Sequence, residues 1–429
     1  MYQNMGKVAT LIDRLKESPL FKDSFWALVG STIGKGLSLI AGIAVARFLG
    51  SEIYGEYGVI RNTLTYIAIV STFGFGYSAT KFIAEHLKND KFKIKALKKK
   101  IENFTFLFSG ILATILCIFA DKIAIIINAP HLADTLRTTS ILVVFNAIIT
   151  TQISILSGFK AFKEIARINT ITGLVTFIFS VIFTKLFKLN GALGALLLSY
   201  IVQYVISEIA IFHEIKSIND GAQISNRDFF KMLKFSLPIA LQESLYTIVH
   251  WIQMYLMIKY ANYIEIGLSS AAILWQSVVI FIPAMLKNVM FSYLSSNHSH
   301  NLVNKLLLIN IISSIVPISV VIILSSFISN IYGDSFNNLP PVLIVCVTSA
   351  FFICISEVYC YELIAKNKQW LVFSARFIRD VITLIATAIV LPLINTKQAL
   401  YMAILGLIMH VFFLVYTYTC HIHIKNDNL

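Results

Sequence analysis

Residues 24–48 read SFWALVGSTIGKGLSLIAGIAVARF, an apolar block with a single lysine, Lys35, near its middle. A helix of about 20 residues, rising 1.5 Å per residue, crosses the roughly 30 Å hydrocarbon core of a bilayer. Helices satisfy their own backbone hydrogen bonds there, which open chains cannot do. This block therefore predicts a first transmembrane helix.

The composition extends this interpretation to the whole chain. Of 429 residues, 57% are hydrophobic and 13% are charged, and the mean hydropathy is +0.77, whereas soluble domains carry roughly a quarter charged residues. We predict an all-α polytopic membrane protein of about twelve transmembrane helices. The predicted spans are 24–48, 59–84, 102–127, 135–158, 169–187, 191–214, 234–259, 267–294, 305–331, 339–363, 371–391 and 398–422.

Basic residues gather in alternate connecting segments, most densely in the run from Lys88 to Lys100. The opposite segments contain only Arg137, Lys185, Lys188 and Lys397. Because basic segments remain in the cytoplasm, both termini are predicted to be cytoplasmic and the number of spans to be even. Ten or fourteen spans would satisfy the same parity.

The stretch from Lys216 to Lys231 divides the spans into two groups of six. A shift of 212 residues places Gly55 on Gly267 and Arg47-Phe48 on Lys259-Tyr260, as in a parallel repeat. Coincidence is an equally good explanation of so few matches. The predicted segments are a cytoplasmic N-terminal segment (1–23), a first six-helix bundle (24–214), a cytoplasmic linker (215–233), a second bundle (234–422) and a cytoplasmic tail (423–429).

Polar residues in the first span lie on one helical stripe, because Ser24, Ser31, Lys35, Ser38 and Gly42 recur every three, four or seven residues. Lys35 lies near the bilayer centre, too far from either interface for its side chain to reach water. An intramembrane lysine requires a water-filled cavity or a counter-ion.

The seventh span has a second stripe of polar residues. The 212-residue shift aligns Lys35 with a position near the centre of this stripe. We expect a central cavity between the halves, with Lys35 on one wall and a titratable pair, Glu243 and His250, on the other. The alternative is that Lys35 and Glu243 form an ion pair holding the halves together. The stripe consists of Ser236, Glu243, Tyr246, Thr247, His250 and Gln253.

Other ionisable residues inside the spans have two interpretations each. Lys287 either lines the cavity or reaches the inner surface. Arg376, Arg379 and Asp380 favour a structural cluster, with Arg376 and Asp380 spaced for a pair within one helix or with Glu357 and Glu362 as partners. Glu208 favours helix packing over ion coupling.

Several function classes are disfavoured by the sequence. It has no phosphate loop, nucleophile elbow, zinc-binding H-E-x-x-H motif or dinucleotide fingerprint. The cysteines lack metal spacing, so we predict no metal and no cofactor. The formal net charge of +13 reflects membrane topology, and no nucleic-acid partner is expected.

The most specific motifs lie near the N-terminus: ARFLGSEIYGEYG at 46–58 and GFG at 74–76. They resemble the bacterial polysaccharide flippases, the O-antigen translocases (Wzx-type) of the multidrug/oligosaccharidyl-lipid/polysaccharide exporter superfamily. Beyond residue 100 the resemblance lies in span number and two-half architecture. It implies two six-helix bundles in a V, similar to multidrug and toxic compound extrusion (MATE) transporters, around a central cavity.

The resemblance also implies a cargo and a location. Such proteins move undecaprenyl-pyrophosphate-linked oligosaccharides from the cytoplasmic to the periplasmic leaflet of the inner membrane by alternating access. The pyrophosphate gives the basic residues a chemical role: the candidates are Lys35 with Ser31 and Ser38, then Lys287, and Arg47 and Arg61 at the outer mouth. Ion or proton coupling would use Glu243. Membrane lipids, a polysaccharide polymerase and a chain-length regulator are the implied partners.

Two rival functions remain. A drug/cation antiporter of the same superfamily would be expected to have an acidic cavity, whereas the stripe of the first span is basic. A membrane glycan polymerase or ligase would have a large periplasmic loop, and the predicted outward loops are short.

Overall fold

The computed structural model describes residues 19–218, 223–296, 300–366 and 368–426. These residues form helices and no strands, as the sequence predicts. The longer helices are α2 (Pro19–Ser71), α3 (Phe75–Asn89), α4 (Ile94–Ile118), α7 (Ile141–Gly158), α8 (Phe162–Ile215), α9 (Asn226–Tyr260), α10 (Tyr263–Ser296), α11 (His300–Ile323), α13 (Leu339–Ala365), α14 (Gln369–Val390) and α15 (Gln398–Asn426). The shorter ones are η1 (Lys91–Lys93), α5 (Ala120–Ile126), η2 (Pro130–Leu132), α6 (Ala133–Thr139), α12 (Ser325–Tyr332), η3 (Asp334–Phe336) and η4 (Leu391–Leu393).

Two of the long helices are hairpins with a one-residue break. In α2 only Gly50 departs from helical geometry, with φ 76° and ψ 168°, a region that glycine enters without steric cost. In α8 the break is at Lys188, and Gly191 at the start of the second arm packs against the Phe183 carbonyl of the first arm. The sequence prediction of a ten-residue outer connection at 49–58 was therefore wrong: most of that motif is helical.

Eight described helices are long and apolar enough to cross a membrane. Two of them, α2 and α8, each contain two spans because of their breaks. Helices α9 and α14 are also long enough, although their charged residues make them less apolar. Over the described residues this gives twelve spans, in agreement with the prediction.

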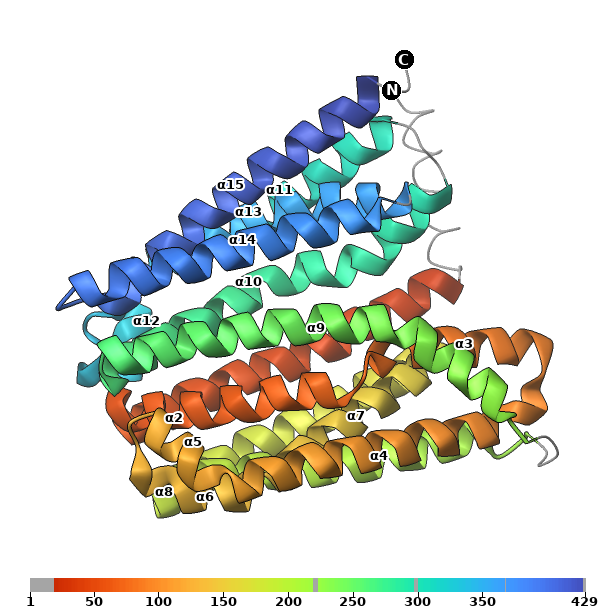
Figure 1. The fold of residues 1–429 in the computed structure, drawn as a ribbon, viewed down its shortest axis with the longest axis horizontal. Coiled ribbons are helices and arrows are strands. Elements are labelled where there is room, and N and C mark those ends of the chain that lie inside the picture. The colour runs from red at the N-terminus through yellow and green to blue at the C-terminus, as the bar shows by residue number, and fades with distance from the viewer. Residues whose placement is uncertain (1–18, 219–222, 297–299, 367, 427–429) are drawn as a thin grey trace, which may run out of the picture.

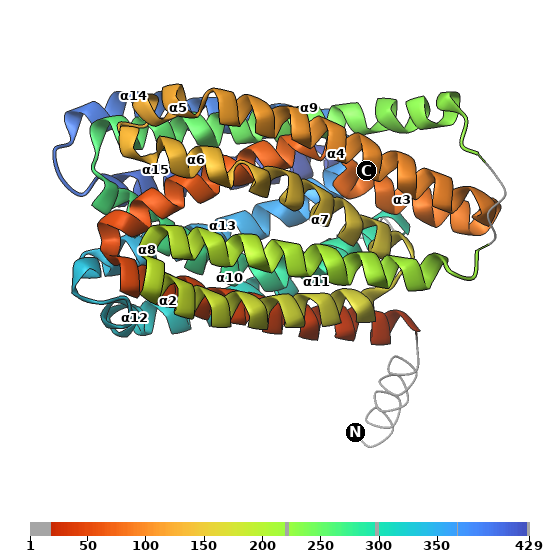
Figure 2. The same ribbon diagram turned by 90° about the horizontal axis from the view of Figure 1, so that it is seen from below.

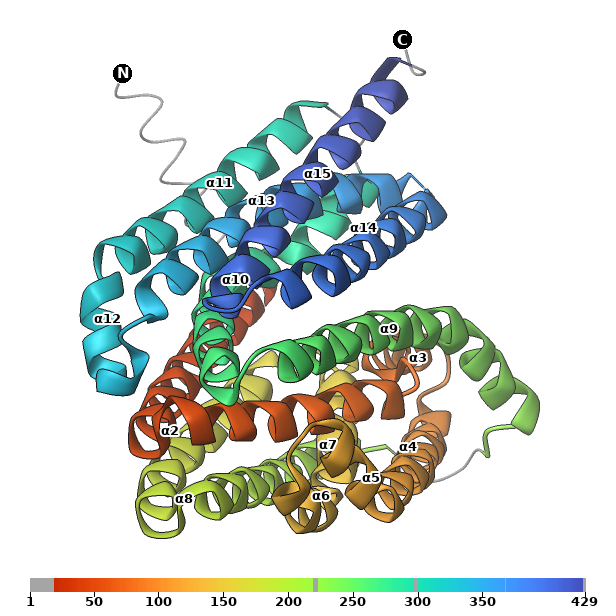
Figure 3. The same cartoon turned by 60° about the vertical axis from the view of Figure 1, so that its left-hand side comes forward.

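The spans form two bundles in a V (Figure 1). Helices α2 to α8 form one bundle, in which they run side by side along the longest axis (Figure 2), and α10 to α15 form the other. The bundles meet at the end that holds the Gly50 turn and α12, and they diverge toward the end that holds the start of α2 and the last turn of α15 (Figures 1 and 3).

Helix α9 follows the linker in sequence and packs against both bundles, with α2 and α3 on one side and α14 on the other. Figure 3 shows it lying along α2 and α3. The Ser236 hydroxyl donates to the Ser78 hydroxyl at 2.7 Å, and a Cβ on Gly74 would lie 2.8 Å from the Ser236 carbonyl oxygen. The GFG motif thus provides a left-handed residue, φ 73° at Gly74, and the close approach that α9 needs.

Candidate functional site

A cavity of about 450 Å³ lies where the two bundles meet, between α2, α8 and α10. Its wall is mixed apolar and polar, and no carboxylate occurs among the described residues that line it. The lining residues are Gly34, Lys35, Ser38, Leu39, Arg61, Asn169, Thr172, Gly173, Gln203, Leu274, Ser277, Val278 and Phe281.

Lys35 reaches this cavity because α2 and α8 pack closely behind it. Gly34 and Gly173 face each other so tightly that a Cβ on Gly173 would lie 3.0 Å from the Gly34 Cα atom. One residue further, Lys35 turns to the open side and has no carboxylate within 4.0 Å among the described residues. The Ser38 hydroxyl, one turn along, donates to the Gly34 carbonyl at 2.8 Å.

Arg61 lines the same cavity as Lys35, and not the outer mouth where the sequence placed it. The error came from the predicted span boundary. Because the chain re-enters the helix directly after Gly50, Arg61 lies about 15 Å along the second span at 1.5 Å per residue. Two cations on neighbouring spans therefore converge on one space, beside the buried rings of Tyr54 and Tyr57.

Neutral polar residues complete the wall, and the sequence assigned none of them to it. They are Asn169 and Thr172 from α8, Gln203 from its second span and Ser277 from α10. The buried Thr172 hydroxyl has no hydrogen-bond partner among the described residues. In the sequence these residues appear as isolated neutral polar side chains within apolar spans. That pattern does not distinguish a residue that lines a cavity from one that contacts a neighbouring helix.

Arg47 lies outside the cavity, at the joint between the bundles. Its Nη1 donates to the Ile331 carbonyl at 3.3 Å, and the Ser51 amide donates to the Ser335 hydroxyl at 3.1 Å. From the second half, the Tyr263 hydroxyl donates to the Ile127 carbonyl at 2.7 Å. These contacts hold the two bundles together, so the structure is closed at the end that holds the Gly50 turn and α12.

Glu243 and His250 do not line the cavity around Lys35. The His250 ring lies 4.0 Å from that of Tyr246 and 6.5 Å from that of Tyr66, and its Nδ1 donates to the Tyr246 carbonyl at 2.9 Å. The second stripe therefore forms a separate polar cluster on α9. Arg379, Asp380 and His410 are close enough to interact electrostatically with His250 or with one another.

The described ion pairs of the second bundle agree with the predicted arrangements at Arg376 and Glu357 and differ from them at Arg379 and Glu362. Arg376 on α14 contacts Glu357 on α13, with Nη2 and Oε1 2.7 Å apart. Arg379 binds its neighbour Asp380, Nε to Oδ1 at 2.8 Å. Glu362 instead binds Lys366 at 2.8 Å and His421 at 2.5 Å.

Two predicted cavity residues lie on described helices, but their side chains are outside the described part of the structure. These are Ser31 on α2 and Lys287 on α10. Glu208, in contrast, is fully described: it pairs with Lys98 and accepts a hydrogen bond from Gln152 at 3.0 Å. It belongs to a structural network within the first bundle.

Comparison with solved structures identifies the same fold in membrane transporters. An inward-facing multidrug resistance MATE family transporter of the MOP superfamily aligns with a TM-score of 0.74 and 14% identity, over 94% of this chain and 100% of that chain. An outward-facing structure of such a transporter gives 0.65 and 13%, over 96% and 98%. The lipid II flippase MurJ in an inward closed conformation gives 0.71 and 18%, over 92% and 87%.

Sequence comparison identifies the family to which the chain belongs. A comparison with curated proteins finds no match. Residues 20–274, more than half of the chain, match the model of a family described as polysaccharide biosynthesis protein. This match covers both N-terminal motifs and confirms the resemblance drawn from them. The chain therefore belongs to the polysaccharide biosynthesis protein family, within the multidrug/oligosaccharidyl-lipid/polysaccharide exporter superfamily of flippases and transporters.

Proposed function

We propose that this protein flips an undecaprenyl-pyrophosphate-linked oligosaccharide, a repeat unit of O-antigen or a similar surface polysaccharide, across the bacterial inner membrane. The observation that carries the proposal is the convergence of Lys35 and Arg61 on one cavity without a carboxylate among its described lining residues. A pyrophosphate crossing the membrane needs cationic partners, and charge-assisted hydrogen bonds from Lys and Arg are the strongest available.

The remainder of the cavity suits a glycan of variable composition. Asn169, Gln203 and Ser277 offer hydrogen-bond donors and acceptors on long or rotatable side chains. A cation antiporter would place carboxylates where this wall has Lys35 and Arg61. The lipid-linked glycan therefore fits the charge of the wall better than an organic cation does.

The direction of transport follows from topology. The basic segments favour cytoplasmic termini, and in that orientation the bundles diverge toward the cytoplasmic leaflet, where the lipid-linked precursor would enter. In this inward-facing state Lys35 and Arg61 meet the headgroup first. Ion or proton coupling would use Glu243 with His250, outside the headgroup cavity. A polysaccharide polymerase and a chain-length regulator would receive the product.

The test is complementation of a bacterial strain that lacks its own flippase. Lys35→Gln and Arg61→Gln should each lower surface polysaccharide at least about tenfold, because an unpaired charge in a desolvated path costs several kcal/mol. Lys35→Arg should retain most activity. Lys122→Gln, the same charge change on the exposed outer helix α5, is the matched control.

Immunoblots of isolated membranes must show equal amounts of each variant. Normal polysaccharide from the double variant Lys35→Gln/Arg61→Gln would refute the proposed cargo. Undiminished export of an organic cation by that variant, together with normal polysaccharide, would favour the antiporter.

A further inference from the structure

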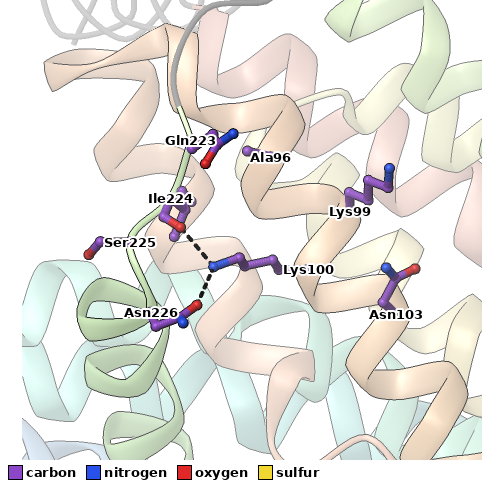
Figure 4. A pocket seen from close by; sticks show the side chains of 8 residues that line it. All are labelled: Ala96, Lys99, Lys100, Asn103, Gln223, Ile224, Ser225 and Asn226. Atoms are coloured by element: carbon purple, nitrogen blue, oxygen red, sulfur yellow. Dashed lines mark hydrogen bonds between the residues drawn. The ribbon is translucent and has the colours of Figure 1, made fainter.

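A second cavity, of about 660 Å³, lies at the inner end of the first bundle and takes no part in the proposed transport path. Figure 4 shows it between α4 and the segment that connects the two halves. Helix α4 contributes Ala96, Lys99, Lys100 and Asn103, and the connecting segment contributes Gln223, Ile224, Ser225 and Asn226.

Lys100 spans this cavity from α4 to the connecting segment (Figure 4). Its Nζ donates to the Ile224 carbonyl at 2.7 Å and to the Asn226 Oδ1 at 3.0 Å. The same Nζ lies 5.8 Å from the Phe229 ring centroid. Both acceptors are neutral, so the contact fixes the ammonium group without cancelling its charge.

The nearby carboxylates are engaged by other residues. Lys98 holds Glu102 at 2.8 Å and also pairs with Glu208, and Lys93 holds Asp90 at 2.9 Å. Neither Lys99 nor Lys100 has a carboxylate within 4.0 Å among the described residues. Within the described part of the chain, the two positive charges of this cavity therefore have no compensating carboxylate.

Among the described residues, Asp228 is the acidic residue that follows the connecting segment, in the first turn of α9, whose N-cap is Ser225. Its backbone amide donates to the Ser225 hydroxyl at 3.1 Å. The Ser225 hydroxyl donates in turn to the Asp228 carboxylate at 3.0 Å, and Lys231 lies 3.4 Å away. The hydrogen bonds that the carboxylate accepts from Ser225 and from Lys231 lower the pKa of Asp228. Its charge is therefore used at the start of α9 and not by Lys99 or Lys100.

An exposed aromatic ring lies one helical turn beyond the connecting segment, in the direction in which α9 enters the membrane. Phe230 in α9 is 67% exposed. Exposed aromatic residues near lysines are typical of the boundary between lipid headgroups and acyl chains. A soluble anion would use the lysines alone, whereas a phospholipid would use both the lysines and the ring.

We propose that this cavity binds the headgroup of an anionic phospholipid, with Lys99 and Lys100 contacting its phosphate and Phe230 contacting its acyl chains. The bound lipid would lie against both α4 and residues 223–226, and so would hold the connection between the halves to the first bundle. This inference does not depend on the transported cargo, because binding to this cavity can be measured without transport.

The test measures binding of short-chain phosphatidylglycerol and phosphatidylcholine to the purified full-length protein in detergent. The wild-type protein should prefer phosphatidylglycerol. Lys99→Gln should weaken that binding about fivefold, since a lysine near an anionic headgroup contributes about 1 kcal/mol. Lys99→Gln/Lys100→Gln should weaken it further and leave phosphatidylcholine binding unchanged.

Lys99→Gln preserves the Lys100 bridge, so its effect does not depend on disturbing the connecting segment. The matched control is Lys368→Gln, which removes an exposed charge from the same end of the second bundle and should leave phosphatidylglycerol binding unchanged. Equal binding by the wild-type protein and the double variant would overturn the proposal. Displacement of phosphatidylglycerol by excess inorganic phosphate would overturn it as well, because the site would then recognise a free anion.

Discussion

Gly55 and Gly267 pack against each other's helices at equivalent positions of the two halves. A Cβ on Gly55 would lie 2.0 Å from the Tyr263 carbonyl oxygen, and a Cβ on Gly267 would lie 2.0 Å from the Ser51 carbonyl oxygen. The 212-residue shift that relates the glycines also relates Ser51 to Tyr263. In each case a glycine Cα–H points to a carbonyl, a weak hydrogen bond that recurs where helices meet closely. This reciprocity supports the parallel repeat.

Gly55→Leu should force the outer joint open, because the neighbouring atoms are backbone and cannot yield. We expect loss of polysaccharide export and at least about tenfold faster labelling of a Ser38→Cys reporter by a membrane-impermeant maleimide. Gly110→Leu, which introduces the same side chain where nothing lies within 4 Å, is the control. Unchanged labelling in the Gly55 variant would exclude a role for this glycine in closure.

Gly74→Ala should destabilise the protein, whereas Gly76→Ala, two residues away, should not. Gly74 has φ 73°, where an alanine costs roughly 1–2 kcal/mol, and its Cβ would crowd the Ser236 carbonyl. At Gly76 the nearest atom is 3.9 Å from the Cβ position. Thermal unfolding in detergent should give a lower midpoint for Gly74→Ala alone. Equal midpoints would contradict the docking of α9 on the first bundle.

Glu243→Gln and Glu208→Gln should affect different properties of the protein, namely transport and stability. Glu208 forms an ion pair with Lys98 and accepts a hydrogen bond from Gln152, so its substitution should lower the midpoint of thermal unfolding. Glu243→Gln should reduce export and its response to a proton gradient, measured in vesicles. A Glu243→Gln protein that exports normally would remove Glu243 from the coupling mechanism.

Arg376→Gln should destabilise the second bundle by on the order of 2 kcal/mol, because it strands the Glu357 carboxylate between α13 and α14. The exposed pair Arg167 and Glu164, 4.0 Å apart, supplies the control, and Arg167→Gln should change the unfolding midpoint little. Restoring opposite charges with Glu357→Arg/Arg376→Glu should recover part of the loss. No recovery would mean that packing, and not charge, dominates at Arg376.

The sequence predicted the number of spans and the position of Lys35 because both depend on local properties, namely hydropathy and helical periodicity. The sequence-based predictions were wrong where close packing of the backbone determines the position of a residue. The break at Gly50 takes one residue, too short for hydropathy to detect, and the resulting shift of the second span moved Arg61 from the mouth into the cavity.

The position of Glu243 was missed for a different reason. A stripe on one helix defines a face, but it does not say which neighbour covers that face. Helix α9 packs between α2 and α14, where His250 of the second stripe lies beside Tyr66 of α2, and neither Glu243 nor His250 lines the cavity around Lys35. Pairing across bundles depends on such contacts between residues distant in sequence.

The docking of α9 on α3 has a consequence for biosynthesis. Ser78 and Ser236 are 158 residues apart in the chain, and a ribosome adding 5–20 residues per second needs about 8–30 s to bridge that distance. During this interval the first half is already in the membrane with the face around Gly74 uncovered. Completion of the first bundle therefore waits for α9, and a fragment ending at the connecting segment would lack the helix that covers it.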